Sequence, residues 1–170
     1  MEIWLVYSLI AAAFTALSAI TGKKVLSKEH AMEFSTVLSI TIAILSIPLF
    51  FLIDYSKLEL IPVLLILSTS ILGALGFLLI AKSMRHMEIS EVMPLLTLSP
   101  AITTFFAFII LDEIPTRLQT LGIIFLIAGA YVIETKKTRL FDPIKLVRES
   151  KYIRYITLAL FLYSVAEVLD

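Results

Sequence analysis

The sequence predicts an all-α integral membrane protein, an antiparallel bundle of five transmembrane helices followed by the start of a sixth. Hydrophobic residues make up 59% of the 170 residues, and the mean hydropathy is +1.00. A soluble fold of this size could not bury so much apolar surface. Charged residues also divide the chain into apolar runs of membrane-spanning length, and the connections are too short for an extramembrane domain.

The first four spans are defined by the charges at their ends. A charge at the centre of the bilayer costs roughly 2.5 to 3.5 kcal/mol, so charged residues mark the limits of each span. The uncharged runs contain 20, 20, 22 and 20 residues, and they lie between Glu2 and Lys23, Glu33 and Asp54, Glu59 and Lys82, and Glu91 and Asp112. Because an acid precedes the first run, this run is predicted to be a retained span and not a signal peptide.

The fifth span is shorter, because only 16 uncharged residues separate Arg117 from Glu134. At 1.5 Å per residue they cover about 24 Å, against a hydrocarbon core of ~30 Å. The helix must therefore begin near Pro115, which suits a first helical position, or let the side chain of Arg117 extend to the interface. Residues 1–134 thus form one predicted five-helix unit.

A basic segment follows the fifth span. Residues 135–154 are polar and rich in Lys and Arg, and they are expected to form a cytoplasmic linker. The apolar run that follows, residues 155–170, is too short to complete a span. It shows a faint similarity to the first span, and after five spans it would begin on the opposite side of the membrane. It is therefore expected to be the start of the first helix of a second, inverted repeat, truncated at this point.

The positive charges predict an orientation in the membrane. Of the 14 Lys and Arg residues, all but Lys57 and Arg117 lie in the odd-numbered loops or in the basic segment. The positive-inside rule places these loops in the cytoplasm and the N-terminus outside. The expected location is the cytoplasmic (inner) membrane.

Small and hydroxyl side chains form a stripe on one face of each of the first four predicted helices, at steps of three and four residues. Four such stripes turned inward would line a weakly polar cavity. Helices in lipid also pack through these residue types, so a purely structural role remains an alternative for each of them. The candidates for lining a substrate pathway are Thr15, Ser18, Thr69, Thr97, Ser99 and Thr104.

Two prolines, Pro94 and Pro100, lie within the fourth predicted helix. Each removes a backbone N–H donor and obstructs the carbonyl four residues earlier, at Ser90 or Leu96. A carbonyl freed in this way can accept a hydrogen bond from a hydroxyl, a water or a substrate, and the alternative is a simple kink. In either case the helix is expected to bend near its middle.

Glu167 is predicted to be an intramembrane acid of functional importance, because it lies well inside the apolar run that follows Arg154. The other charged residues near span ends are expected to be interfacial anchors, although Lys82 and Glu91 could turn inward. No catalytic set and no metal or cofactor site is indicated. The chain has no cysteine, and no basic surface suggests nucleic-acid binding.

The clearest motifs lie in the fourth and fifth spans, with a related pattern in the third. They are Gly73-Ala74-Leu75, Pro94-Leu95, Ser99-Pro100-Ala101, Thr103, Ala107, Leu111-Asp112-Glu113, Gln119, Gly122 and Ala128-Gly129-Ala130-Tyr131. Over roughly residues 3–134 the chain resembles the EamA domain of the drug/metabolite transporter superfamily. The resemblance implies a five-helix repeat, usually doubled to ten helices with inverted halves, and a central pathway lined by the first four helices of each half.

The chain departs from the family pattern at three points. Asp112 replaces the usual glycine of the turn after the fourth helix. The charge distribution argues for an orientation opposite to that of the common N-terminal repeat. The first span also lacks the buried glutamate that small multidrug exporters of the superfamily use for proton coupling.

The expected function is secondary transport of a small metabolite, an amino acid or an amphipathic compound by alternating access of two repeats. The expected partners are the substrate, the lipid bilayer and a second repeat, supplied by the same chain or by a paired or identical chain. We expect neither enzymatic activity nor a cofactor. The alternative is a membrane scaffold or assembly subunit that transports nothing, in which the polar stripes bury only helix contacts.

Overall fold

The computed structural model describes residues 3–52, 59–135 and 150–169, and the ordered elements in these ranges are helices. Their bounds are α1 (Ile3–Leu26), α2 (Ala31–Phe50), α3 (Leu60–His86), α4 (Ile89–Leu96), α5 (Ser99–Leu111), α6 (Arg117–Thr135) and α8 (Lys151–Leu169). The all-helical prediction is therefore confirmed. The expected basic linker lies largely in residues 136–149, outside the described residues.

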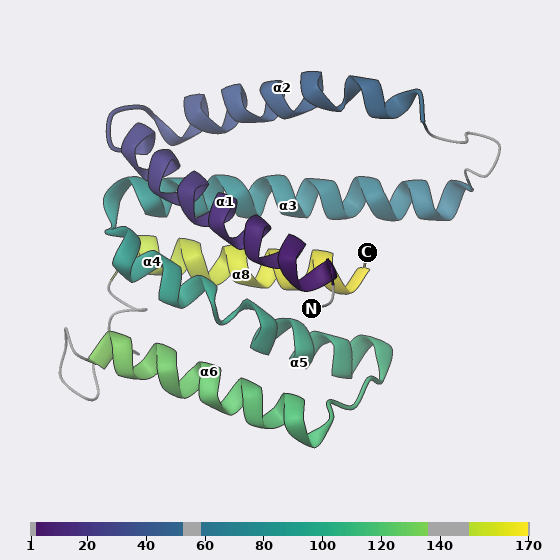
Figure 1. Ribbon diagram of the computed structural model, residues 1–170, viewed down its shortest axis with the longest axis vertical. Coiled ribbons are helices and arrows are strands. Elements are labelled where there is room, and N and C mark those ends of the chain that lie inside the picture. Colours follow the sequence, from purple (N-terminus) through teal and green to yellow (C-terminus); the bar gives the residue numbers. More distant parts are fainter. Residues whose placement is uncertain (1–2, 53–58, 136–149, 170) are drawn as a thin grey trace.

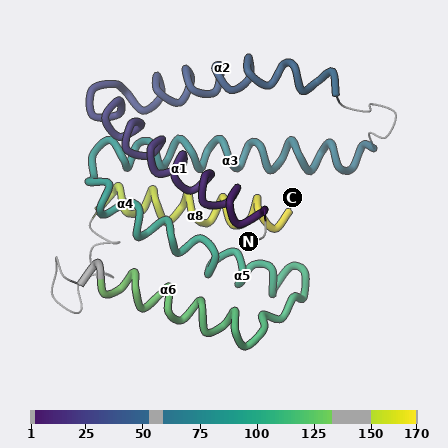
Figure 2. Tube along the Cα trace, viewed as in Figure 1, coloured from purple at the N-terminus to yellow at the C-terminus, as the bar shows by residue number. Residues whose placement is uncertain are grey.

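The helices run back and forth across the molecule, with α1 crossing the others obliquely (Figure 1). Short turns join α1 to α2 and α3 to α4, so the ends of α1 and α3 lie beside the starts of α2 and α4. We call this end of the bundle the basic end. Its basic residues in the described ranges are Lys23, Lys24, Lys28, Lys82, Arg85, Lys151 and Arg154. The loop between α5 and α6 lies at the other end (Figure 2).

Membrane insertion explains the distribution of apolar side chains. Large hydrophobic residues are exposed along α1, α2, α5 and α6, including Leu45 at 72% and Phe125 at 74%. Such a surface would be unfavourable in water, whereas lipid tails solvate it. Helices α1, α2, α3, the α4–α5 pair and α8 are long and apolar enough to cross a membrane, and α6 contains a shorter apolar helix at Arg117–Val132. The chain is an integral membrane protein.

Helix α8 lies in the centre of the bundle. It packs against α3 on one side and α5 on the other, and it runs in the opposite direction to α1 (Figure 1). Its residues Ile156 and Leu160 join Leu26, Ala81 and Val92 in the main buried cluster. The last helix is thus an integral part of the packing of the preceding ones.

The extent of α8 corrects the sequence-based boundary. The helix begins at Lys151, whereas its apolar run was expected to start at Tyr155, and its 19 residues are enough to cross a membrane. Tyr152 explains the earlier start, because its ring stacks on His86 with centroids 4.3 Å apart. Its backbone carbonyl also accepts a 2.9 Å hydrogen bond from the hydroxyl of Ser83. These contacts fix the first turn of α8 to the end of α3.

The close approach of α3 and α8 depends on a glycine. Gly76 on α3 faces Tyr163 on α8, and a methyl group at Gly76 would lie 3.0 Å from the tyrosine ring. This distance is shorter than an ordinary van der Waals contact of 3.4–4 Å, so a larger residue would require the tyrosine ring to shift. Small residues that let helix backbones approach are typical of packing in lipid.

The fourth span is broken in two, between α4 and α5, where Thr97 and Leu98 leave the helix. The N–H of Leu98 bonds to the carbonyl of Leu95 at 3.1 Å, so it is not available to the carbonyl of Pro94, its partner in a regular helix. The hydroxyl of Thr97 donates to that carbonyl at 2.6 Å instead. A hydroxyl therefore satisfies the carbonyl of Pro94, and partners for the carbonyls of Ser90 and Leu96 remain a prediction.

Candidate functional site

A polar cavity of about 360 Å³ lies between α5, the loop after it, the start of α6 and the end of α8. Helix α5 contributes one wall, the loop and α6 contribute a second, and α8 contributes a single acid. The lining residues are Pro100, Thr103, Thr104, Ala107, Glu113, Ile114, Pro115, Gln119 and Glu167. Residues far apart in the sequence therefore meet around one space.

Hydroxyl and carboxylate groups connect α5 to α8 at this cavity. The Thr103 hydroxyl lies 2.6 Å from Oε2 of Glu167 and 3.1 Å from the hydroxyl of Ser164, which is fully buried. A threonine hydroxyl has one proton and two lone pairs. It therefore donates to the carboxylate and accepts from Ser164, so one side chain on α5 satisfies two on α8.

The two threonines of α5 have different partners. The hydroxyl of Thr104 donates to the carbonyl of Pro100 in its own helix, at 2.7 Å. A threonine bonded in this way satisfies its proton locally and keeps a lone pair for another donor. Thr104 can thus accept a hydrogen bond from a solute in the cavity, whereas Thr103 holds the acid.

The turn after α5 brings Glu113 to the cavity. Asp112 has φ 59° and ψ 24°, the left-handed conformation that often ends a helix, and its N–H bonds to the carbonyl of Ala107. Aspartate tolerates this region better than most residues other than glycine. The tight turn therefore forms with an aspartate at the position where the resemblance implies a glycine.

Gln119 lines the cavity from the first turn of α6. Its side-chain oxygen accepts bonds from the N–H of Thr116 at 2.7 Å and from the hydroxyl of Thr116 at 2.9 Å. These bonds pair the residue before the helix with the third residue in it, as in a capping box. The oxygen of Gln119 is thus used for structure, which fixes the position of its amide at the cavity wall.

The cavity lining carries negative but no positive charge. Among the described lining residues, Glu113 and Glu167 are ionisable acids and there is no Lys or Arg. Nor do three or more His, Asp or Glu side chains come together as a metal site anywhere in the described ranges. Hydroxyls, an amide and carboxylates around one space can bind a polar solute through hydrogen bonds and favour a cationic group over an anionic one.

The structure brings only some of the predicted site residues to this cavity. Pro100, Thr104 and Glu167 line it, and Ser99 is the first residue of α5. Thr15 and Ser18 are exposed on α1, and the hydroxyl of Thr15 donates to the carbonyl of Ala11. Thr97 is exposed at the break, and Thr69 is buried in α3. A role for these residues in a pathway remains a prediction.

The sequence-based prediction did not select Thr103, Glu113 and Gln119, which line the cavity. Glu113 was expected to be an interfacial anchor, and Thr103 and Gln119 were noted only as matches to the family motif. The residue spacing gave no signal for them, because the cavity forms only once α8 packs beside α5. Their presence in the motif was the available clue.

Comparison with known proteins places the chain in context. Residues 2–135 match the EamA-like transporter family, which covers every described helix before α8. No curated protein and no solved structure matches the chain.

Proposed function

Because the chain belongs to the EamA-like transporter family, we propose that it carries a small metabolite, an amino acid or an amphipathic compound across the membrane by alternating access. In this mechanism the binding site opens to one side of the membrane at a time, and two repeats rock around it. The second repeat comes from the same chain or from a paired or identical chain. Transport by a carrier of this type requires a polar site that the lipid does not fill.

The cavity between α5, α6 and α8 is the single observation that supports this proposal most strongly. It brings hydrogen-bond acceptors and donors together between largely apolar helices, and because polar groups inside a membrane are costly, those that are present usually serve a function. Glu113 and Glu167 favour a solute that carries an amine or another cationic group. Thr104 and Gln119 would orient it by hydrogen bonds.

The break between α4 and α5 supports the conformational part of the proposal. Interrupted helices in transporters supply both binding groups and a point of bending. Here Thr97 and Leu98 separate two rigid helices, and α5 is joined to α8 by Thr103. We propose that α5 and α8 move together and that the break absorbs the change in angle.

The remaining predicted residues have a place in the same scheme. Thr15, Ser18, Thr69, Thr97 and Ser99 would line the path between the cavity and the basic end as the site changes access. The clustering of Lys and Arg at the basic end favours a cytoplasmic location for that end and an external N-terminus. The cavity would then face the outer half of the inner membrane.

Transport by the reconstituted full chain tests this function. The assay measures uptake into proteoliposomes of a panel of labelled amino acids, amphipathic amines and small carboxylic acids. Uptake of at least one amine-bearing compound is expected to exceed that in protein-free vesicles. The double variant Thr103→Val/Thr104→Val is expected to reduce that uptake by about fivefold or more, because it removes the hydroxyls at the cavity.

A matched control shows whether the loss of uptake is specific to hydroxyls at the cavity or follows from removing any threonine hydroxyl. Thr120 on α6 is exposed, and its hydroxyl donates to the carbonyl of Thr116 within its own helix. The Thr120→Val variant is expected to retain full uptake. Equal uptake by the double variant and the wild-type protein would remove this cavity from the transport path.

A further inference from the structure

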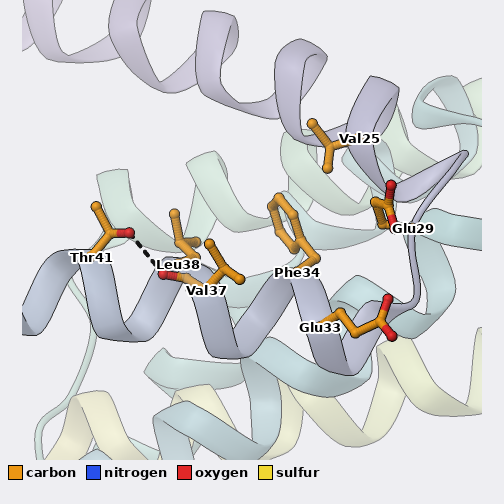
Figure 3. Close-up of a pocket in the computed structure, with 7 residues that line it drawn as sticks. All are labelled: Val25, Glu29, Glu33, Phe34, Val37, Leu38 and Thr41. Carbon is orange, nitrogen blue, oxygen red and sulfur yellow. Dashed lines mark hydrogen bonds between the residues drawn. The ribbon is translucent and has the colours of Figure 1, made fainter.

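A second cavity, of about 400 Å³, lies between the end of α1 and the first half of α2, apart from the polar cavity (Figure 3). Its lining residues are Val25, Glu29, Glu33, Phe34, Val37, Leu38 and Thr41. The five residues from α2 follow one another along that helix, with Thr41 at one end and Glu33 at the other, and Glu29 lies at the same end as Glu33, in the loop that joins the helices. The cavity is therefore an elongated groove with charge at one end only.

The body of the groove is apolar. Phe34, Val37 and Leu38 form its wall on α2, and Val25 faces them from α1 (Figure 3). The hydroxyl of Thr41 donates to the carbonyl of Val37 at 2.8 Å, so its proton is satisfied within the helix. A groove of this kind, open along two membrane-spanning helices, fits a hydrocarbon chain.

The charged end of the groove adjoins a basic hollow. This basic hollow is lined by Lys24, Val25, Ser27, Lys28 and Glu29. It shares Val25 and Glu29 with the groove. Negative and positive side chains therefore stand next to each other where the apolar wall ends. These side chains come from the last turn of α1 (Lys24), from the short loop that follows it (Lys28 and Glu29) and from the first turn of α2 (Glu33).

The neighbouring basic residues have other roles. The ammonium group of Lys23 donates to the carbonyls of Met84 and Met87, 2.6 Å away in the second case, and so binds the end of α3. The guanidinium of Arg85 contacts the ring of His30. Lys24 and Lys28 are therefore the basic residues that the structure leaves at the hollow.

We propose that the groove and the hollow together bind a phospholipid with a primary ammonium headgroup, of the phosphatidylethanolamine type. One acyl chain lies along Phe34, Val37 and Leu38. The phosphate lies at Lys24 and Lys28, and the ammonium lies at Glu29 and Glu33. The groove and the hollow share Val25 and Glu29, so the phosphate and the ammonium of one headgroup can lie at neighbouring basic and acidic side chains beside the apolar wall.

Charge complementarity distinguishes this lipid from other phospholipids. A primary ammonium donates hydrogen bonds to carboxylates, and such charge-assisted bonds are among the stronger ones. The trimethylated headgroup of phosphatidylcholine has no N–H donor. The headgroup of phosphatidylglycerol has no cation, so it would leave the carboxylates of Glu29 and Glu33 without a positively charged partner from the lipid. The site is therefore selective, and it is independent of the proposed transport function.

Lipid retention by the full chain tests the proposal. The purified protein is exchanged into detergent with equal amounts of phosphatidylethanolamine, phosphatidylcholine and phosphatidylglycerol, and native mass spectrometry counts the bound lipids. Phosphatidylethanolamine is expected to be retained in preference to the other two. The Glu29→Gln/Glu33→Gln variant is expected to lower that preference roughly fivefold, and Lys24→Gln/Lys28→Gln to lower retention of all three lipids.

Two controls keep the experiment decisive. Glu59→Gln and Arg117→Gln each remove one charge, of the same sign as the charges removed in one of the test variants, away from the basic end, and they are expected to leave lipid preference unchanged. A phosphatidylethanolamine with a photoreactive acyl chain is expected to crosslink the wild-type chain within residues 34–41, which does not depend on any variant folding. Equal retention of the three lipids, crosslinks elsewhere, or a dimer without bound lipid would overturn the proposal.

Discussion

The hydroxyl of Thr103 on α5 donates a 2.6 Å hydrogen bond to the carboxylate of Glu167 on α8. The same hydroxyl lies 3.1 Å from the buried hydroxyl of Ser164, one turn earlier on α8. Residues more than 60 positions apart in the sequence thus join two helices at the wall of a polar cavity. This link gives the predicted intramembrane acid a defined position and a defined partner.

Removing the Thr103 hydroxyl should weaken the contact of α5 with α8. The Thr103→Val variant keeps the shape of the side chain but leaves Ser164 and Glu167 without this partner. The expected loss is about 1 kcal/mol in the free energy of unfolding, the usual size for hydrogen bonds between membrane helices. Thermal unfolding in detergent measures it. The Thr103→Ser variant keeps a hydroxyl and should unfold close to wild type, and equal losses in both variants would contradict the hydrogen-bond account.

Gly76 and Gly73 provide a matched pair on α3. A methyl group at Gly76 would press on the ring of Tyr163, whereas one at Gly73 would meet nothing within 4 Å. We expect Gly76→Ala to lower the free energy of unfolding by roughly 1 kcal/mol or more through overpacking. Gly73→Ala should be neutral or stabilising, since alanine favours the helix. A Gly76→Ala variant as stable as Gly73→Ala would show that α8 can move away from α3 at no cost.

The turn at Asp112 should be improved by glycine. Asp112 holds a positive φ, which costs most residues other than glycine roughly 1 to 2 kcal/mol. The Asp112→Gly variant is therefore expected to be as stable as wild type or more stable, and Asp112→Val is expected to be less stable by about that amount. Denaturation in detergent gives the order of the three proteins. An Asp112→Val variant as stable as wild type would mean that the turn does not need a residue that tolerates the left-handed backbone conformation.

The sequence allowed the helices to be located but not their packing. Charges at the run ends place the spans from α1 to α6, because a charge is excluded from the bilayer core whatever the tertiary structure. The position of α8 between α3 and α5 depends instead on shape, such as the fit of Tyr163 against Gly76. No periodicity along the chain encodes a fit of that kind.

The start of α8 shows why charges can mislead as boundaries. Lys151 and Arg154 are exposed on the first turn of α8, where long side chains can extend to the interface while the backbone stays helical. The same turn is fixed by Tyr152 against His86. A boundary drawn at the last basic residue therefore falls four residues too late.

The candidate site could be predicted only in part for a related reason. Hydroxyl stripes predicted Thr104 at the cavity together with Thr15 and Ser18, which the structure leaves exposed on α1. A stripe shows which face of a helix is polar, but it does not show what that face meets. Thr103 lies beside Thr104 in the sequence, yet it is the residue whose partner on α8 defines the site.

Water access at Thr104 tests the central claim most directly, because the native chain has no cysteine to interfere. A thiol reacts as its thiolate, which forms in contact with water and not with lipid. A Thr104→Cys variant in membranes is treated with a membrane-impermeant maleimide, beside an Ile109→Cys variant on the exposed apolar side of α5. The account predicts that the cysteine at position 104 reacts about tenfold faster than the one at 109. Equally slow labelling at both positions would contradict a solvent-accessible pathway at this cavity.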